Sequence, residues 1–355
     1  MNRNLMGLAA LVLIIAGIVA YRLIAVGPAA TVLLKGYVGG EKAGLLQNEK
    51  VLSILARKYK VRLDWSKAGS MEMVRDSVQK ADFLWPSSEV ALAYYKMQHG
   101  NLAKSEIIFN SPIVIYSWDI VADALARQKI VTSRDGIYYI TDLPRLVELA
   151  VDGKKWSDIG LSQLYGKVTI TSTDPNKSNS GAMFAGLLAS VLCGDVTDSA
   201  NLACVLPKIK SYFLSLGYME HSSGDLFQQY LSTGVGAKPM IVGYESQIIE
   251  FSMQNAAQWP TVKTKVRILY PEPTVWSAHP LIMQSPKAEA LKNALLDPEV
   301  QKISWEQHGF RTGMMGAQND PKLLSVVGIP AQITKVIPMP SPGIMDRILN
   351  SIQGQ

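Results

Sequence analysis

The chain of 355 residues has little of what metal sites and catalytic centres are built from. It contains two cysteines and four histidines, and none of the histidines is paired at metal-ligand spacing. No Gly-x-Ser-x-Gly, His-Glu-x-x-His or Walker motif occurs. We therefore predict no metal, no cofactor and no enzymatic activity.

The chain also lacks a basic run. Its formal net charge is +6, but the Lys and Arg residues are spread along the sequence, which has no low-complexity tract. This distribution argues against a nucleic-acid site. The modest positive potential weakly favours an anionic ligand or an anionic membrane surface.

The N-terminal 30 residues indicate export. Arg3 precedes an apolar run at residues 5–20, and Arg22 interrupts its continuation to residue 26. This pattern is typical of a signal peptide, and it is nearly long enough to span a bilayer. No cysteine follows the run, which excludes a lipoprotein anchor. We predict a periplasmic or other extracytoplasmic protein. An uncleaved anchor in the inner membrane is favoured over a cleaved peptide.

The two cysteines, Cys193 and Cys204, flank a short loop between two apolar helical segments. In an oxidising compartment a disulfide there would fix the second helix against the first. We expect this disulfide, and two free cysteines are the alternative.

Strand and helix patterns alternate after the N-terminal segment. Strands are predicted at residues 31–37, 61–65 and 81–85, and helices at 48–58, 71–80 and 89–98. Such alternation predicts a parallel sheet with helices on both faces. The length, about 325 residues beyond the N-terminal segment, predicts two lobes rather than one core.

Polar or glycine-rich loops follow three of these strands. In open α/β sheets the ligand lies beyond the carboxyl ends of the strands. We therefore expect ligand contacts from Gly39, Gly40, Glu41, Ser70, Ser87 and Ser88.

A second group of candidates follows a predicted strand at residues 168–173. A loop of Asn, Ser and Gly at 176–181 opens an apolar helix, and such a loop suits an anion or a ligand oxygen. Simple capping by Asn179 or Ser180 is the alternative. A further strand at 240–244 and helix at 245–251 meet at a polar edge. The ligand candidates here are Ser178, Asn179, Ser180, Gly181, Tyr244 and Glu245.

These patterns together resemble the type II periplasmic solute-binding proteins of ABC transporters. The resemblance covers residues 31–316 and is closest in local motifs to sulfate- and molybdate-type binders. It depends on residues 173–184, 39–42 and 243–246, and on the late helix with its Gly-Phe-Arg turn at 295–311.

The resemblance implies a two-lobed α/β fold, each lobe a mostly parallel sheet flanked by helices. Two extended segments, 107–117 and 266–283, would be the hinge strands. The implied organisation is an N-terminal signal or anchor at 1–30 and a first lobe at 31–115 and 271–355, the latter part including the tail. The second lobe would be 116–270.

The implied function is closure of the two lobes over a small polar solute, with an oxyanion as one candidate, for uptake through an ABC permease. Ser, Asn and backbone donors suit an oxyanion, whereas Glu41 and Glu245 in one cleft would favour a cation or an amine. For Glu41, Tyr244 and Glu245, helix capping and core packing are the alternative roles. A membrane-tethered sensor or interaction module of the same fold is the alternative function, favoured by the tail at 317–355.

Overall fold

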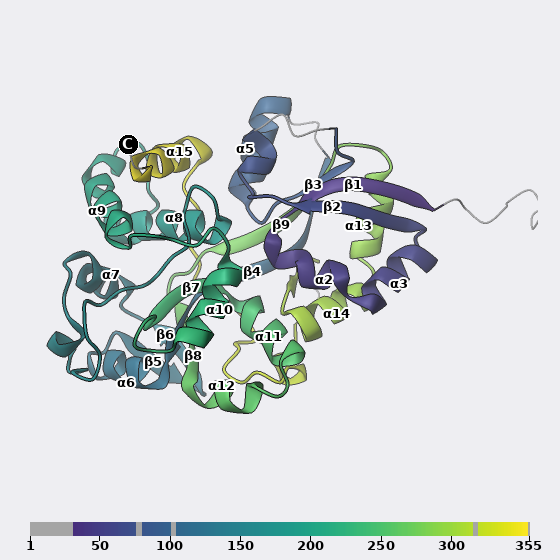
Figure 1. Ribbon diagram of the computed structural model, residues 1–355. Helices are drawn as coiled ribbons and strands as arrows, with labels where there is room; N and C mark the ends of the chain where they lie inside the picture. The colour runs from purple at the N-terminus through teal and green to yellow at the C-terminus, as the bar shows by residue number, and fades with distance from the viewer. Residues whose placement is uncertain (1–30, 76–79, 101–103, 315–318, 354–355) are drawn as a thin grey trace, which may run out of the picture.

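The computed structural model describes residues 31–75, 80–100, 104–314 and 319–353 (Figure 1). The predicted signal or anchor at 1–30 lies outside these residues. Within them, no helix combines the length and the apolar composition that a membrane crossing requires.

The first lobe begins with three strand–helix units, as the alternation predicts. The strands β1 (Val32–Val38), β2 (Val61–Lys67) and β3 (Phe83–Trp85) form a parallel set with β1 in the middle. The intervening helices are η1 (Gly40–Lys42), α2 (Ala43–Gln47), α3 (Glu49–Arg57), α4 (Glu72–Arg75) and α5 (Glu89–His99). Later in the chain α13 (Ala288–Leu295), α14 (Pro298–His308) and β10 (Arg311–Thr312) complete this lobe.

One long strand connects the two lobes. β4 (Lys104–Trp118) pairs antiparallel with β9 (Trp276–Met283) along its first part. Along its second part it pairs with β7 (Met240–Tyr244) and β8 (Val266–Pro271). With β5 (Val131–Arg134) and β6 (Ile137–Ile140) at one edge, the strand order is β2-β1-β3-β9-β4-β8-β6-β5, and β7 and β10 also pair with β4. The predicted crossover segment at 107–117 lies within β4, and the one at 266–283 comprises β8 and β9. These strands confirm the two-lobed α/β fold.

The second lobe surrounds β5 (Val131–Arg134), β6 (Ile137–Ile140), β7 and β8 with helices (Figure 1). Its largest hydrophobic cluster buries residues of α8 and α9 together, and a separate cluster fills the first lobe around Phe83 and Trp85. The remaining helices are α6 (Asp119–Arg127), α7 (Leu143–Val151), η2 (Trp156–Ile159), α8 (Asn179–Cys193), α9 (Leu202–Ser215), α10 (Ser223–Thr233), α11 (Glu245–Gln254) and α12 (Trp259–Lys265).

The predicted strand at 168–173 is wrong as a strand. The segment is paired only through one isolated bridge, between Thr171 and Ile241 of β7. Thr171 exchanges backbone hydrogen bonds with Met240 and Val242 of β7, at 2.9 Å each. The carbonyl of Ile170 instead accepts from the Tyr212 hydroxyl of α9 at 2.5 Å, so side-chain contacts replace a continuous ladder.

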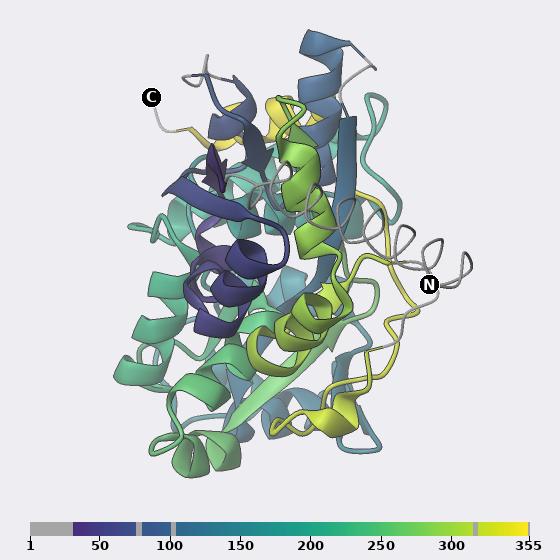
Figure 2. The same cartoon turned by 90° about the vertical axis from the view of Figure 1, so that its right-hand side faces the viewer.

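The tail returns from the first lobe to the second, as Figure 2 shows from the side. After η3 (Pro321–Leu323) it passes Thr274, which exchanges backbone hydrogen bonds with Lys335 and Ile337. It ends in α15 (Pro342–Ile352), whose apolar face packs in the same cluster as α8 and α9. The tail is thus a third connection between the lobes.

The expected disulfide between Cys193 and Cys204 is not formed, and both are free thiols. Cys193 is half-buried at the end of α8, and Cys204 is exposed on α9. Each thiol lies against the same acceptor, the carbonyl of Asn201, at 3.7 and 2.8 Å respectively. Burial raises the pKa of the Cys193 thiol. The loop therefore satisfies both sulfur atoms without a covalent bond.

Candidate functional site

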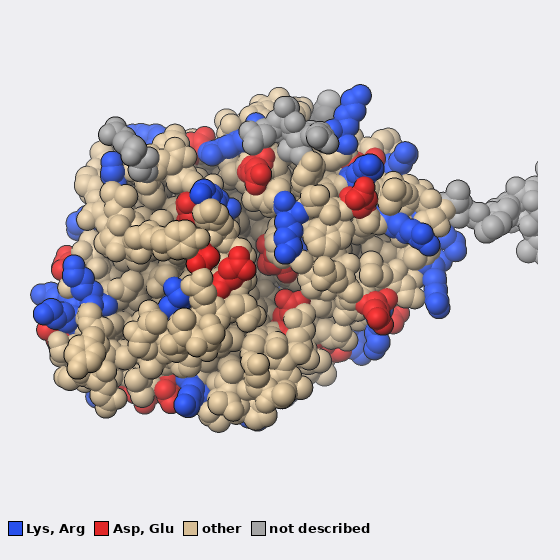
Figure 3. Space-filling view, in the orientation of Figure 1, with Lys and Arg blue, Asp and Glu red and all other residues tan. Residues whose placement is uncertain are grey.

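A cleft of about 770 Å³ lies between the two lobes. Figure 3 shows a hollow at the middle of the molecule with acidic and basic side chains around it. Of the predicted residues, Gly39, Gly40, Glu41, Ser70, Ser178, Asn179 and Tyr244 line this cleft. The named candidates do not include the other residues that line the cleft, which are Lys67, Ala68, Gly69, Met71, Glu72, Arg75, Pro175, Asn176, Lys177, Ala182, His221, Ser222, Ser223 and Asp225.

A buried charged cluster forms the first-lobe wall of the cleft. The Lys42 side chain is fully buried, and its Nζ lies 2.5 Å from Oε1 of Glu41 and 2.6 Å from Oγ of Ser87. The Ser87 hydroxyl also donates to Oε1 of Glu41. Lys42 was not among the predicted residues. It follows Glu41 in a polar, glycine-rich segment, and nothing in such a segment predicts that a lysine is buried.

The ionisation of this cluster follows from its contacts. Burial alone would raise the pKa of Glu41, but Lys42, His279 and the Ser87 hydrogen bond lower it to about 2. Burial lowers the pKa of Lys42, and Glu41 partly offsets that effect. Burial and the nearby Lys42 hold the pKa of His279 well below its usual value. At neutral pH the cluster is thus a Glu–Lys ion pair beside a neutral imidazole.

His279 has an unusual environment for a polar side chain. It is fully buried, and among the described residues neither ring nitrogen has a hydrogen-bond partner. Its Nδ1 lies 3.6 Å from Oε1 of Glu41, and its ring meets Phe310 edge to face at 5.3 Å. The ring therefore packs as an aromatic group.

The start of α8 forms the second-lobe wall. Nδ2 of Asn179 donates to the carbonyl of Ser87 at 2.6 Å and to the Tyr244 hydroxyl at 3.0 Å. Asn179 therefore joins the second lobe to the first. Ser178 is the N-cap residue, but no side chain caps the helix. Capping by Asn179 or Ser180 is thus not what the structure shows.

Two of the predicted loop residues lie behind this wall. The buried Ser180 hydroxyl bonds to Oγ1 of Thr173 at 2.9 Å and to the Ser178 hydroxyl at 3.1 Å. A Cβ atom on Gly181 would lie 2.3 Å from the carbonyl oxygen of Thr173. Glycine at 181 thus allows α8 to begin directly against the preceding segment.

The remaining first-lobe candidates support the cleft. The buried Ser70 hydroxyl accepts from the backbone N–H of Ser87 at 2.9 Å, which fixes the loop after β3. Ser88 is the N-cap of α5, and its hydroxyl accepts from Val90 N–H at 3.2 Å. Ser87 and Ser88 are both buried and do not line the cleft.

Glu245 points away from the cleft. Its carboxylate forms a two-point ion pair with Arg311, at 2.6 and 2.8 Å, and accepts from the Tyr270 hydroxyl at 2.7 Å. The side chain is fully buried and its charge is neutralised there. Arg311 also donates to the carbonyls of Pro330 and Ala331, so this pair holds the tail.

Charged residues of both signs line the outer cleft. Lys177 contacts His221 at 3.0 Å and lies 3.9 Å from Asp174. Arg75 pairs with Asp346 of α15, which links the first lobe to the tail helix. Lys67 has no ion-pair partner among the described residues.

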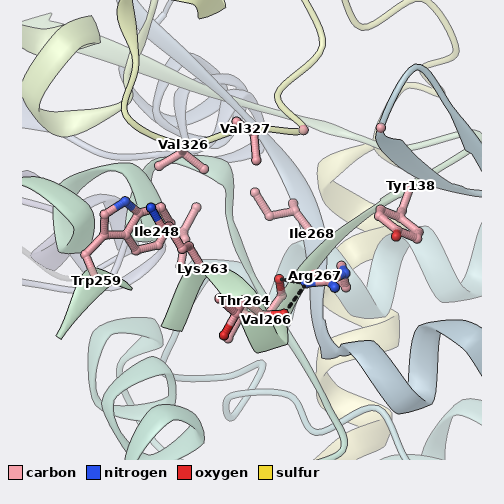
Figure 4. Close-up of a pocket in the computed structure, with 12 residues that line it drawn as sticks. Tyr138, Ile248, Trp259, Lys263, Thr264, Val266, Arg267, Ile268, Val326 and Val327 are labelled. Atoms are coloured by element: carbon pink, nitrogen blue, oxygen red, sulfur yellow. Dashed lines mark hydrogen bonds between the residues drawn. The ribbon is translucent and has the colours of Figure 1, made fainter. Parts of the chain in front are cut away.

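A second cavity, of about 460 Å³, lies away from all predicted residues (Figure 4). Its walls come from β6, β8, α11, α12 and the tail, and they combine apolar side chains such as Trp259 and Ile268 with the basic side chain of Lys263. Arg267 there donates to the carbonyls of Thr264 and Val266, at 3.0 Å each.

Comparison with known proteins shows the fold. No protein-family model matches the chain, and no curated protein matches its sequence. A putative extracellular solute-binding protein from Bordetella parapertussis matches over 90% of this chain and 97% of its own, with TM-score 0.57 and 13% identity. Iron-bound HitA from Pseudomonas aeruginosa matches over 90% and 98%, with TM-score 0.57 and 14% identity. The sulfate-binding protein SubI from Mycobacterium tuberculosis H37Rv matches over 92% and 100%, with TM-score 0.52 and 14% identity. The chain thus has the fold of the periplasmic solute-binding proteins.

Proposed function

We propose that this chain is an extracytoplasmic solute-binding protein that closes its two lobes over a small polar solute. The observation that carries the proposal is the cleft of about 770 Å³ with walls from both lobes. The fold supports it, because the solved structures of similar fold include proteins named as solute-binding proteins.

Closure follows from contacts on both walls. A solute that touches both lobes binds the closed state more tightly than the open state and shifts the equilibrium toward closure. The bond from Asn179 to the Ser87 carbonyl is a direct contact between the lobes, and we assign it to the closed state. Closure also removes water, which strengthens each polar contact to the solute.

The start of α8 is the group that we assign to an anionic part of the solute. The first N–H groups of a helix have no acceptor within it, and no side chain supplies one at this helix. The positive end of the dipole of this 15-residue helix favours an oxyanion there. Burial of Glu245 against Arg311 supports this assignment, because that charge no longer faces the cleft.

For export and delivery, we assign residues 1–30 to an export signal or inner-membrane anchor and propose an ABC permease as the partner.

A membrane-tethered sensor module is the second candidate function. The tail helix α15 favours it, because its Asp346 pairs with Arg75 of the first lobe and offers a route for signalling closure.

Native mass spectrometry of the purified full-length chain in mild detergent tests the proposal. We expect a non-covalent adduct of a small polar solute that disappears on dialysis. Small-angle scattering should then report a larger radius of gyration for the solute-free chain. A chain that never retains a solute and keeps one radius in every solute tested would contradict the proposal.

A further inference from the structure

The two oxygens of the Glu41 carboxylate have different surroundings. Oε1 receives Lys42 Nζ at 2.5 Å and the Ser87 hydroxyl, with His279 Nδ1 at 3.6 Å. Oε2 receives no donor from the described residues. Among the described residues, the fully buried side-chain polar atoms that lack a hydrogen-bond partner belong to Ser111, His279 and Gln301. Oε2 of Glu41 is not one of them, so this oxygen is accessible. Oε2 is therefore open to the cleft that Glu41 lines.

This oxygen is a permanent acceptor. Lys42, His279 and the Ser87 hydrogen bond lower the pKa of Glu41 to about 2, so the carboxylate is ionised at neutral and mildly acidic pH. Lys42 cannot turn toward the cleft to cover Oε2, because its side chain is fully buried and its Nζ is bonded to Glu41 and Ser87. Gly39 lies directly against the carboxylate, and a Cβ there would be 2.7 Å from Oε2.

The acceptor lies close to the anion-binding end of α8. Ser87 bonds to Glu41 through its hydroxyl and to Asn179 through its carbonyl. Ser87 thus connects the Glu41 carboxylate to Asn179 at the start of α8, and both Glu41 and Asn179 line the cleft. A solute with acceptor atoms only would leave this ionised oxygen unpaired and would be repelled by it.

We propose that the solute carries an N–H or O–H donor next to its anionic group, and that Oε2 of Glu41 selects for this donor. Hydrogen phosphate, a phosphonate monoanion and a hydroxy acid belong to this class, whereas fully ionised sulfate and molybdate do not. The inference rests on the proposed function and narrows the oxyanion class that sequence analysis left open.

Titration calorimetry with matched pairs tests this selection. The probes are dihydrogen phosphate with sulfate, the methylphosphonate monoanion with methanesulfonate, and glycolate with acetate, at mildly acidic pH. Methylphosphonate and methanesulfonate match in shape and charge and differ in the donor. Sulfate carries one more negative charge than dihydrogen phosphate, and acetate lacks the hydroxyl group of glycolate. We expect at least one donor-bearing probe to bind about 10- to 100-fold more tightly than its partner, the usual effect of a hydrogen bond to a charged group.

A double variant shows whether Glu41 is responsible. Glu41→Gln with Lys42→Met removes both charges at nearly constant volume, and the Gln amide can donate to an acceptor-only anion. For the probe pair that shows a preference with the wild type, the ratio of the two affinities should fall to about threefold or less, or the preference should reverse. The matched control is Glu289→Gln with Lys292→Met, an ion pair on α13 away from the cleft, which should keep the wild-type preference.

Three results would overturn the inference. These are equal or tighter binding of the acceptor-only probes, an unchanged preference in the Glu41→Gln, Lys42→Met variant, and silence from all six probes. A co-purified solute without a donor would also overturn it while leaving the solute-binding function intact. Failure of the function itself would appear separately, as the absence of any adduct and of any change in radius.

Discussion

At the scale of single residues, the first-lobe wall depends on a lysine that has no contact with solvent. Lys42 is fully buried, and its ammonium is balanced by Glu41 and hydrogen-bonded to Ser87. Its ring contact with Trp85, at 5.4 Å from Nζ to the centroid, adds a further favourable interaction. A buried pair of this kind contributes little as a pair, but loss of one partner leaves an uncompensated charge.

Lys42→Met should therefore lower the free energy of unfolding by about 3–5 kcal/mol, because Glu41 loses its counter-charge. The double variant Glu41→Gln, Lys42→Met should recover most of that loss. Urea unfolding of both variants measures the difference. A single variant as stable as the wild type would show that the two groups are not coupled.

The same cluster sets a dependence of stability on pH. The pKa of His279 in the folded state lies well below 6.5. As pH drops through about 6.5, His279 is therefore protonated in the unfolded chain but stays neutral in the folded protein. This difference in proton uptake lowers the free energy of unfolding. The pKa of Glu41 falls from 4.5 to about 2 on folding, so its contribution is complete above 4.5 and is lost between 4.5 and 2.

Unfolding free energies measured from neutral pH to pH 2 separate the two effects. His279→Phe should flatten the upper part of the curve, and Glu41→Gln with Lys42→Met the lower part. If both variants reproduced the wild-type slope, other groups would control the acid limb.

At the scale of elements, the start of α8 shows what periodicity and loop composition can predict. The apolar run after Ala182 is a buried helix, and three of the four predicted loop residues bond to one another or across the lobes. The preceding strand could not be predicted correctly. Its β-branched residues suit a strand, but side chains such as Tyr212 use its carbonyls and leave a single bridge to β7.

Asn179 gives the prediction that belongs to this element. Asn179→Ala removes the bonds to the Ser87 carbonyl and the Tyr244 hydroxyl. The closed state should lose stability relative to the open state, and the affinity for the solute should fall by about tenfold, mostly through faster dissociation.

Stopped-flow dissociation and calorimetry measure this loss. Asn176→Ala is the control, because Asn176 also lines the cleft, but its side chain bonds to the tail at Leu349 and Gln353. Equal effects of the two substitutions would argue against a specific role for the contact between the lobes.

At the scale of the whole molecule, the sequence predicts the two lobes well and their connections in part. Length and alternation predict the lobes, and the two extended segments predict the crossing strands. The third connection, made by the tail, has no hydrophobic pattern in the sequence that predicts it. Residues 324–341 form no helix or strand, and their position depends on contacts with residues such as Arg311 and Thr274. Pairing of Glu245 with Arg311 is likewise set by the fold, since 66 residues separate them.

The central claim is that the cleft closes over a solute, and a distance between the lobes tests it most directly. Spin labels at Met97 of α5 and Leu214 of α9, both exposed, would be placed in a full-length chain with both native cysteines changed to serine. Pulsed dipolar spectroscopy then compares the chain with its co-purified solute and after dialysis. We predict a shorter and narrower distance distribution with the solute bound. One unchanged distribution, for a solute shown by calorimetry to bind, would contradict closure of the lobes.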